Sequence, residues 1–137
     1  MNEQTPQTQE KPLLLGWPVD NADFKVVQLE TRKGLVMKLG DLDAFHRTIL
    51  KNCLEELGIN PVKDDAASER KRDFVPKLSG PDYKVVGMGQ GGIYDFSSKE
   101  IHFCGRSMDY GLEVNREHLD QVMKANKPDW KYDMEEW

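Results

Sequence analysis

The sequence predicts a single α/β (α+β) domain, with helices packed on both faces of a mixed β-sheet of about five to six strands. Segments rich in β-branched and aromatic residues recur along the chain, and two longer segments carry apolar residues at helical spacing. At 137 residues the chain is long enough to bury one hydrophobic core. Strand and helix patterns mixed along one short chain indicate a sheet covered by helices.

The first elements expected are a polar arm and a hairpin. Residues 1–18 are rich in Gln, Glu, Thr and Pro, which predicts a flexible N-terminal arm, and the domain proper is expected over 19–137. The segment 24–30 (FKVVQLE) has apolar residues on both faces, as in a strand that is covered on both sides. A turn at 31–34 (TRKG) then leads into a second strand at 35–39 (LVMKL).

A helix is expected to follow from Asp41 and to stop at Gly58, a residue suited to a left-handed helix end. Its apolar residues predict one buried face, made of Leu42, Phe45, Ile49, Leu50, Cys53, Leu54 and Leu57. His46 falls near the centre of this face, just over one turn into the helix. It is either a core histidine bonded to a backbone carbonyl or a functional group near a helix N-terminus.

The second half of the chain predicts a long surface loop, further strands and a second helix. The segment 60–81 has three prolines and heavy mixed charge, which is typical of an exposed loop or insertion. Strand patterns occupy 83–89, 91–96, 100–105 and 129–134, and the middle two form a predicted hairpin. Asn115 is placed to cap a second helix, which Pro128 ends.

Composition argues against several classes of protein. The formal net charge of −5 leaves no broad cationic face for nucleic acid. No apolar run approaches the roughly 20 residues of a membrane-spanning helix. With two cysteines outside any spaced set, and no basic and apolar leader, we expect a cytoplasmic, reduced protein, monomeric and free of membranes.

A glycine run formally satisfies the dinucleotide pattern G-x-G-x-x-G at Gly87, Gly89 and Gly92. That fingerprint requires a helix directly after the glycines, so that the helix N-terminus holds the pyrophosphate. Here a strand pattern follows instead. The run is therefore interpreted as a flexible turn or a close crossing of two backbone segments.

The histidines and cysteines do not predict a metal site. His46, His102 and His118 are scattered, and Cys53 and Cys104 do not belong to any metal-binding spacing. A site assembled in space stays open, but no cofactor and no metal are expected. For His102 and His118 taken alone, a hydrogen-bonded or exposed histidine is the preferred interpretation.

Two lysines suggest an anion site beside His46. If 31–34 is a four-residue turn, Val27 lies opposite Lys38 and Lys25 lies opposite Gly40. Both lysines then share one sheet face as a diagonal pair, about 7–8 Å apart. Two ammonium groups, a helix N-terminus and an imidazole would converge on one small anion. The alternative is a pair of lysines that merely extend to solvent from strand ends.

The segment from Lys99 to Gly111 (KEIHFCGRSMDYG) resembles the protein histidine phosphatases of the Janus family. The hallmark of that family is a strand with Ile-His that runs into a Gly-x-Ser-x-x-Tyr-Gly loop. It is matched here by Ile101, His102, Gly105, Ser107, Tyr110 and Gly111. The segments DFKVVQLE, DAFHRTI and KANKPDWKY follow the family's pattern and order, so the likeness covers most of the chain beyond the arm.

The resemblance implies a mixed sheet with helices on both sides and metal-independent removal of phosphoryl groups from phosphohistidine in proteins or peptides, with phospholysine as a further substrate. It implies His46 as the catalytic general base or nucleophile, its pKa lowered by the helix dipole and the lysines. The implied phosphate-binding residues are Lys25, Lys38, Ser107, Met108 and Asp109, with Arg106 and Tyr110 as auxiliary residues.

The chain departs from the family pattern at a few positions, and these support an alternative function. Gly92 stands about where family members carry a further arginine, and Arg106 is the nearest candidate to compensate. Asp109 puts a carboxylate in the phosphate loop, and Asn115 replaces a second histidine. The alternative is a catalytically weak paralogue that binds a phosphorylated or acidic partner.

Overall fold

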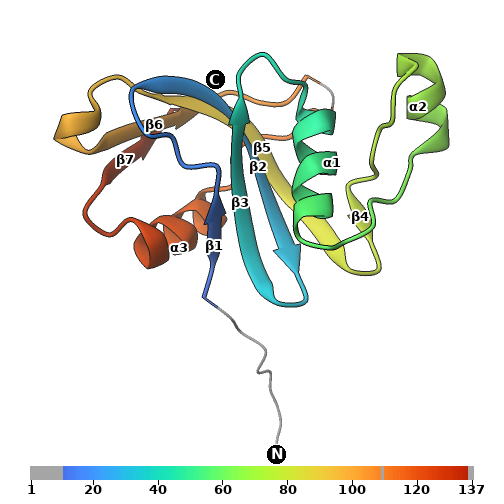
Figure 1. Ribbon diagram of the computed structural model, residues 1–137, viewed down its shortest axis with the longest axis horizontal. Coiled ribbons are helices and arrows are strands. Elements are labelled where there is room, and N and C mark those ends of the chain that lie inside the picture. Colours follow the sequence, from blue (N-terminus) through green and yellow to red (C-terminus); the bar gives the residue numbers. More distant parts are fainter. Residues whose placement is uncertain (1–10, 109, 136–137) are drawn as a thin grey trace, which may run out of the picture.

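A curled mixed sheet runs through the molecule, and helices cover both of its faces (Figure 1). The computed structural model describes residues 11–108 and 110–135. Within them the strands are β1 (Leu13–Leu15), β2 (Ala22–Thr31), β3 (Gly34–Asp41), β4 (Ser79–Gly80), β5 (Tyr83–Ile93), β6 (Glu100–Cys104) and β7 (Lys131–Met134). The helices are α1 (His46–Glu56), α2 (Asp65–Lys71) and α3 (Arg116–Asn126), with a 3₁₀ turn η1 (Phe96–Ser98). The predicted fold class is confirmed.

The sheet order is β1-β3-β2-β5-β6-β7, with β4 paired to the start of β5. The two end pairs, β1 with β3 and β6 with β7, are parallel, and the other pairs are antiparallel. Strand β2 lies between β3 and β5; it pairs with β5 along its whole length and with β3 over all but its first two residues. Both of its faces are buried because its side chains alternate between two cores, with Phe24 and Val26 in one and Val27 and Leu29 in the other, as the apolar segment at 24–30 predicts.

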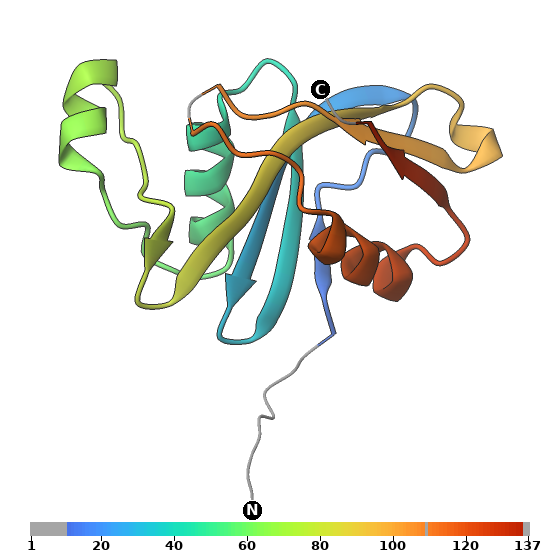
Figure 2. The same ribbon diagram turned by 180° about the vertical axis from the view of Figure 1, so that it is seen from behind.

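Each face of the sheet carries its own core, because successive strand residues point to opposite sides. The core under α3 consists of Phe24, Val26, Met37, Leu39, Ile93, Ile101, Phe103, Val114, Leu119, Val122 and Met123. The core under α1 consists of Val27, Leu29, Val36, Ile49, Leu50, Cys53, Leu54, Tyr83, Val85 and Met88. Figure 2 shows the face of the sheet that α3 covers.

The predicted register of the first hairpin is confirmed. Lys25 pairs with Gly40, and Val27 pairs with Lys38. The hairpin is closed by a tight turn, in which Gly34 has a φ of +128° that only glycine adopts readily. Both lysines consequently lie on the α1 face of the sheet.

Two loop predictions need correction. Residues 13–15 lie within the segment interpreted as a flexible arm, yet they form β1, which pairs with β3. Leu14 packs against the core under α3 and Leu15 packs against the core under α1, which explains why this short segment joins the sheet. Trp17, also within the predicted arm, packs against the core under α3, and residues 1–10 lie outside the described residues. The predicted loop at 60–81 contains α2 and β4, and the Asp64 side chain caps α2 by accepting from the Ala67 amide at 3.0 Å.

Helix α1 begins five residues later than the sequence pattern indicates. Asp41 forms a turn in which its carbonyl accepts from the Ala44 amide and its carboxylate accepts from the Asp43 amide. Leu42 and Phe45, predicted to face inward, are 37% and 55% exposed because they precede the helix. His46 is therefore the first residue of α1 and not a residue of its second turn.

Helix α3 begins as predicted, since the Asn115 side chain accepts from the His118 amide at 3.0 Å. The imidazole of His118 is buried and its Nε2 lies 2.9 Å from the Leu29 carbonyl oxygen. Within the described residues its Nδ1 has no hydrogen-bond partner. Burial lowers the pKa of His118 below its usual 6.5, because a charged ring would lose its hydration.

This burial predicts a pH dependence of stability. The unfolded histidine takes up a proton near pH 6.5, while folded His118 stays neutral to a lower pH. The free energy of unfolding should therefore fall as the pH drops below about 6.5, by at most about 1.4 kcal/mol per pH unit, until the lowered pKa is reached. Urea unfolding of His118→Gln should lack this slope, and His102→Gln should retain it. Equal slopes in wild type and His118→Gln would contradict the prediction.

Candidate functional site

The predicted catalytic residue lies where α1 meets the middle of β5. The side chain of His46 is 5% exposed, and its Nε2 is 2.7 Å from the carbonyl oxygen of Gly89. Residues 105–108 and 110–111 pass beside the same end of α1 in both views (Figures 1 and 2). The start of α1 and the Gly89 carbonyl thus meet at the imidazole, and the loop after β6 runs beside that end of the helix.

The contact with Gly89 determines the tautomer of the neutral ring. A carbonyl oxygen only accepts hydrogen bonds, so Nε2 must carry a proton and donate it. In neutral His46 the lone pair is then on Nδ1. The atom suited to take a proton or to attack an electrophile is therefore Nδ1.

Lys25 reaches the same end of the helix. Its ammonium donates to the carbonyl oxygen of Ala44 at 2.6 Å, just two residues before His46. The first amides of a helix have no acceptor within the helix, and the helix dipole adds positive potential there. The Lys25 ammonium is therefore held at the segment that leads into α1, as the hairpin register and the turn predict.

Lys38 does not join them. Its ammonium forms an ion pair with Glu56 at 2.8 Å, at the last residue of α1. Ten residues of helix separate Glu56 from His46, which corresponds to about 15 Å along the axis. The predicted convergence of both lysines on one anion is wrong in this structure. The prediction that both lysines share one face of the sheet is confirmed, but the side chain of Lys38 extends toward the C-terminal end of α1.

The loop after β6 is held in shape by its own backbone. Gly105 and Gly111 have φ values of +73° and +71°, which favour glycine. The Ser107 amide donates to the Leu112 carbonyl at 2.8 Å, and the Gly111 amide donates to the Ser107 carbonyl at 2.8 Å. The buried Ser107 hydroxyl accepts from the Tyr110 amide at 3.2 Å.

The remaining predicted loop residues have different surroundings. Met108 is 94% exposed, so its side chain is open to a partner. Asp109 lies outside the described residues. Arg106 pairs with Glu113 at 2.7 Å across the base of the loop, and the Tyr110 hydroxyl donates to the Pro76 carbonyl at 2.7 Å. These two contacts fasten the loop, and Arg106 is engaged at its base.

Gly92, which stands about where the resembled family carries an arginine, is crowded and lies beside a carboxylate. Gly92 pairs with Asp23 in the sheet. A Cβ on Gly92 would lie 2.6 Å from an Asp23 carboxylate oxygen and 2.7 Å from the Tyr94 ring. A long cationic side chain at this position would require both neighbours to move.

The glycine run allows a close crossing of two backbone segments, which was one of its two interpretations. It lies within β5, and the chain from Cys104 to Asn115 passes against it. A Cβ on Gly87 would lie 2.8 Å from the Asn115 amide nitrogen, and one on Gly89 would lie 2.8 Å from the Cys104 carbonyl oxygen. The alternative interpretation, a flexible turn, is wrong.

An ion pair that the sequence analysis did not foresee joins the segment 60–81 to the start of α1. The Arg47 guanidinium lies 3.0 Å from the Asp73 carboxylate and 4.0 Å from the centroid of the Phe45 ring. The hydrogen bond from Arg47 lowers the pKa of Asp73. No motif links these positions, because they meet only through the fold of the 60–81 segment.

The thiol in the core under α1 is not a reactive group. Cys53 is fully buried behind α1, and burial raises its pKa to about 12. Only thiolates are effective nucleophiles and metal ligands, so this cysteine belongs to the core. In residues 11–108 and 110–135, no three His, Cys, Asp or Glu side chains gather closely enough to hold a metal ion.

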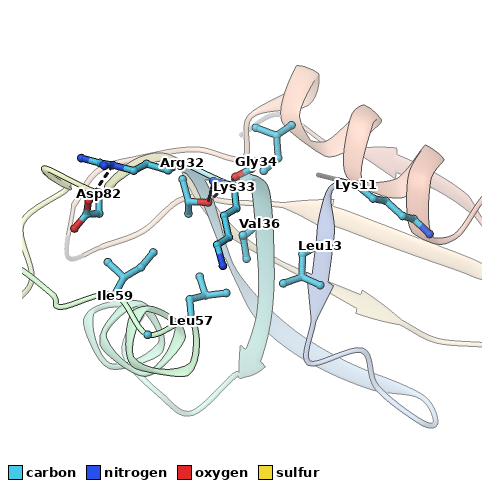
Figure 3. A pocket seen from close by; sticks show the side chains of 12 residues that line it. Lys11, Leu13, Arg32, Lys33, Gly34, Val36, Leu57, Ile59 and Asp82 are labelled. Atoms are coloured by element: carbon cyan, nitrogen blue, oxygen red, sulfur yellow. Dashed lines mark hydrogen bonds and ion pairs between the residues drawn. The ribbon is translucent and has the colours of Figure 1, made fainter. Parts of the chain in front are cut away.

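A hollow of about 320 Å³ lies at the other end of α1 (Figure 3). None of the predicted site residues lines it.

In the part of the chain that the structure describes, no helix is long and apolar enough to cross a membrane.

Comparison with known proteins does not assign the chain to a family. A search against models of protein families finds no match, and a search of curated proteins finds no significant relative.

The crossing at the glycine run predicts unequal effects of two similar substitutions. Gly89→Ala should lower the free energy of unfolding by about 1–3 kcal/mol, because the new methyl group meets the Cys104 carbonyl, which cannot move independently. Gly92→Ala should cost clearly less, since the Asp23 carboxylate can rotate away. Chemical unfolding of both variants measures the difference. Equal losses would show that the crossing adapts easily.

Proposed function

We propose that the chain is a protein histidine phosphatase that hydrolyses the phosphoramidate bond of phosphohistidine in proteins or peptides without a metal ion. The observation that carries the proposal is the setting of His46: it is buried at the first residue of α1, it is fixed through Nε2 to Gly89, and it follows by two residues the Ala44 carbonyl that holds the Lys25 ammonium. The resemblance of the segment 99–111 to the family's loop supports it.

The reaction would consume one water and release histidine and inorganic phosphate. As a nucleophile, Nδ1 of His46 forms a bond to phosphorus while the substrate N–P bond breaks, and the departing imidazole takes its electron pair and a proton from water. Water then attacks the phosphorylated His46 and frees phosphate. As a general base, Nδ1 instead takes a proton from the water that attacks phosphorus; the N–P bond breaks, and the departing imidazole takes its electron pair and then the proton that Nδ1 accepted. Both routes use the lone pair that the Gly89 contact leaves on Nδ1.

Lys25 and the start of α1 would stabilise the transferred group. Phosphoryl transfer spreads negative charge over the equatorial oxygens, and cations with aligned amides are what lowers its barrier. The buried Ser107 and the loop around it would border the phosphate on the side opposite α1. The same chemistry would accept phospholysine, whose bond to phosphorus is also a phosphoramidate.

Exposed apolar side chains around the site favour a polypeptide substrate. Leu42 and Phe45 lie directly before His46, and Met108 lies in the neighbouring loop; all three are exposed. Exposed apolar side chains grouped near a site are typical of contact surfaces. We propose that the protein acts as a monomer in the cytoplasm on phosphohistidine-containing proteins.

A second candidate function is binding of a phosphorylated or acidic partner without efficient turnover. Two observations favour it. Lys38 is neutralised by Glu56, and Asp23 stands against Gly92, where family members have an arginine. Both reduce the positive charge available to a phosphoryl group.

The decisive experiment is hydrolysis of a phosphohistidine peptide in excess chelator by wild type, His46→Ala and His46→Asn. We expect wild type to turn over and both variants to lose about 100-fold or more in rate, because the base or nucleophile is removed. Circular dichroism and unfolding curves verify that the variants are folded. Full activity in His46→Ala would refute the enzyme proposal, and binding without turnover in wild type would favour the second candidate.

The two lysines should differ in importance. Lys25→Ala should reduce kcat/KM by about 10- to 100-fold, the effect of losing one charged hydrogen bond to phosphate. Lys38→Ala should change it by less than about threefold, because Lys38 lies at the far end of α1. Lys84→Ala, at an exposed position of β5, is the matched control. Equal losses in the Lys25 and Lys38 variants would mean that Lys38 leaves Glu56 when substrate binds.

A further inference from the structure

The hollow at the C-terminal end of α1 has the features of a ligand site of its own. It is enclosed by the end of α1, the turn between β2 and β3, and β1 (Figure 3). Its volume of about 320 Å³ falls in the range of small-molecule pockets, which begins near 300 Å³. His46 lies at the opposite end of the helix, so the hollow is separate from the candidate phosphatase site.

The wall of the hollow is aliphatic. Leu13, Leu35, Val36, Leu57 and Ile59 line it from three different parts of the chain. Gly58 adds no side chain, and a Cβ there would meet no heavy atom within 4 Å. Leu13 is 41% exposed, so this apolar surface is open to solvent. An apolar chain that entered would remove such surface from water.

One cation enters the hollow. Figure 3 shows the Lys33 side chain extending into it, whereas the Lys11 side chain starts at its rim and points away. In the described part of the chain neither ammonium forms an ion pair. Arg32 is paired with Asp82 at 3.0 Å. Three cationic residues and one carboxylate line the hollow, so its lining has a positive excess although the whole chain has a net charge of −5.

One alternative explanation accounts for only part of this arrangement. Helix α1 has no basic residue in its last turn, so Lys33 also offsets the negative end of the helix dipole. That role explains a cation at this position. It does not explain an open aliphatic wall beside it.

We propose that this hollow binds a small amphipathic anion with one aliphatic chain and a carboxylate. The chain packs against Leu13, Leu57 and Ile59, and the carboxylate pairs with the Lys33 ammonium. Apolar walls supply affinity and a single charged group fixes the orientation, as in other small-molecule sites. The proposal does not depend on the phosphatase activity.

The test uses decanoate as the probe and decyltrimethylammonium as a control with the same tail and the opposite charge. We expect decanoate to cause saturable shifts in the ¹H–¹⁵N spectrum at Leu13, Lys33 and 57–59, and the cation to cause none at equal concentration. Lys33→Glu should weaken decanoate binding by about tenfold or more through loss of the charged partner. Lys84→Glu changes a lysine of β5 outside the hollow and should leave the affinity unchanged.

Several results would overturn the proposal. Equal binding of both detergents, or no saturable shift with decanoate, would show that the hollow does not select an amphipathic anion. Loss of binding in Lys84→Glu as well as Lys33→Glu would indicate a non-specific charge effect. A dimer in sedimentation experiments that Ile59→Glu dissociates, without any response to decanoate, would mean that a second copy of the chain covers this surface.

Discussion

Three parts of the chain meet at the hydrogen bond between His46 and the Gly89 carbonyl, and the candidate site depends on this contact. It joins the first residue of α1 to the middle of β5 at 2.7 Å. At the same residue the chain leaving β6 crosses so closely that a Cβ on Gly89 would lie 2.8 Å from the Cys104 carbonyl oxygen. The same contact buries the imidazole and gives it a defined tautomer. A packing constraint and a chemical requirement are therefore satisfied by one glycine.

The two ends of α1 organise the charges on this face of the molecule. At the N-terminal end the carbonyl of Ala44 holds the Lys25 ammonium close to the helix amides, where a bound anion would be stabilised. At the C-terminal end Lys38 pairs with Glu56, and Lys33 extends into the neighbouring hollow. Cations at a helix C-terminus are favoured by its dipole. One helix thereby separates the proposed phosphate site from a second cationic surface.

The sequence patterns predicted the register of the first hairpin correctly, but they did not predict where the ammonium group of Lys38 lies. Alternation and turn chemistry were enough to place Lys25 opposite Gly40, because register in a tight hairpin follows from the turn. The start of α1 was predicted too early, since Asp41 can cap a turn as readily as a helix. The position of the Lys38 ammonium could not be predicted from the sequence. It depends on where Glu56 lies after the helix has packed.

The choice between catalysis and binding turns on how a dianion would be neutralised. Lys25 and the start of α1 supply positive charge, while Asp23 faces the position where the family has an arginine. Lys38 is the remaining lysine of this sheet face, and its partner Glu56 is 46% exposed. Exposed ion pairs contribute only about 0–1 kcal/mol, so the pair itself is a weak restraint. Lys38 lies two residues before Gly40 in β3, about 7 Å along the strand. A change of its side-chain rotamer toward Gly40 would therefore cost little free energy. If the proposed function holds, the positive charge at this site therefore comes from Lys25 and the start of α1, and Lys38 would add to it only by leaving Glu56.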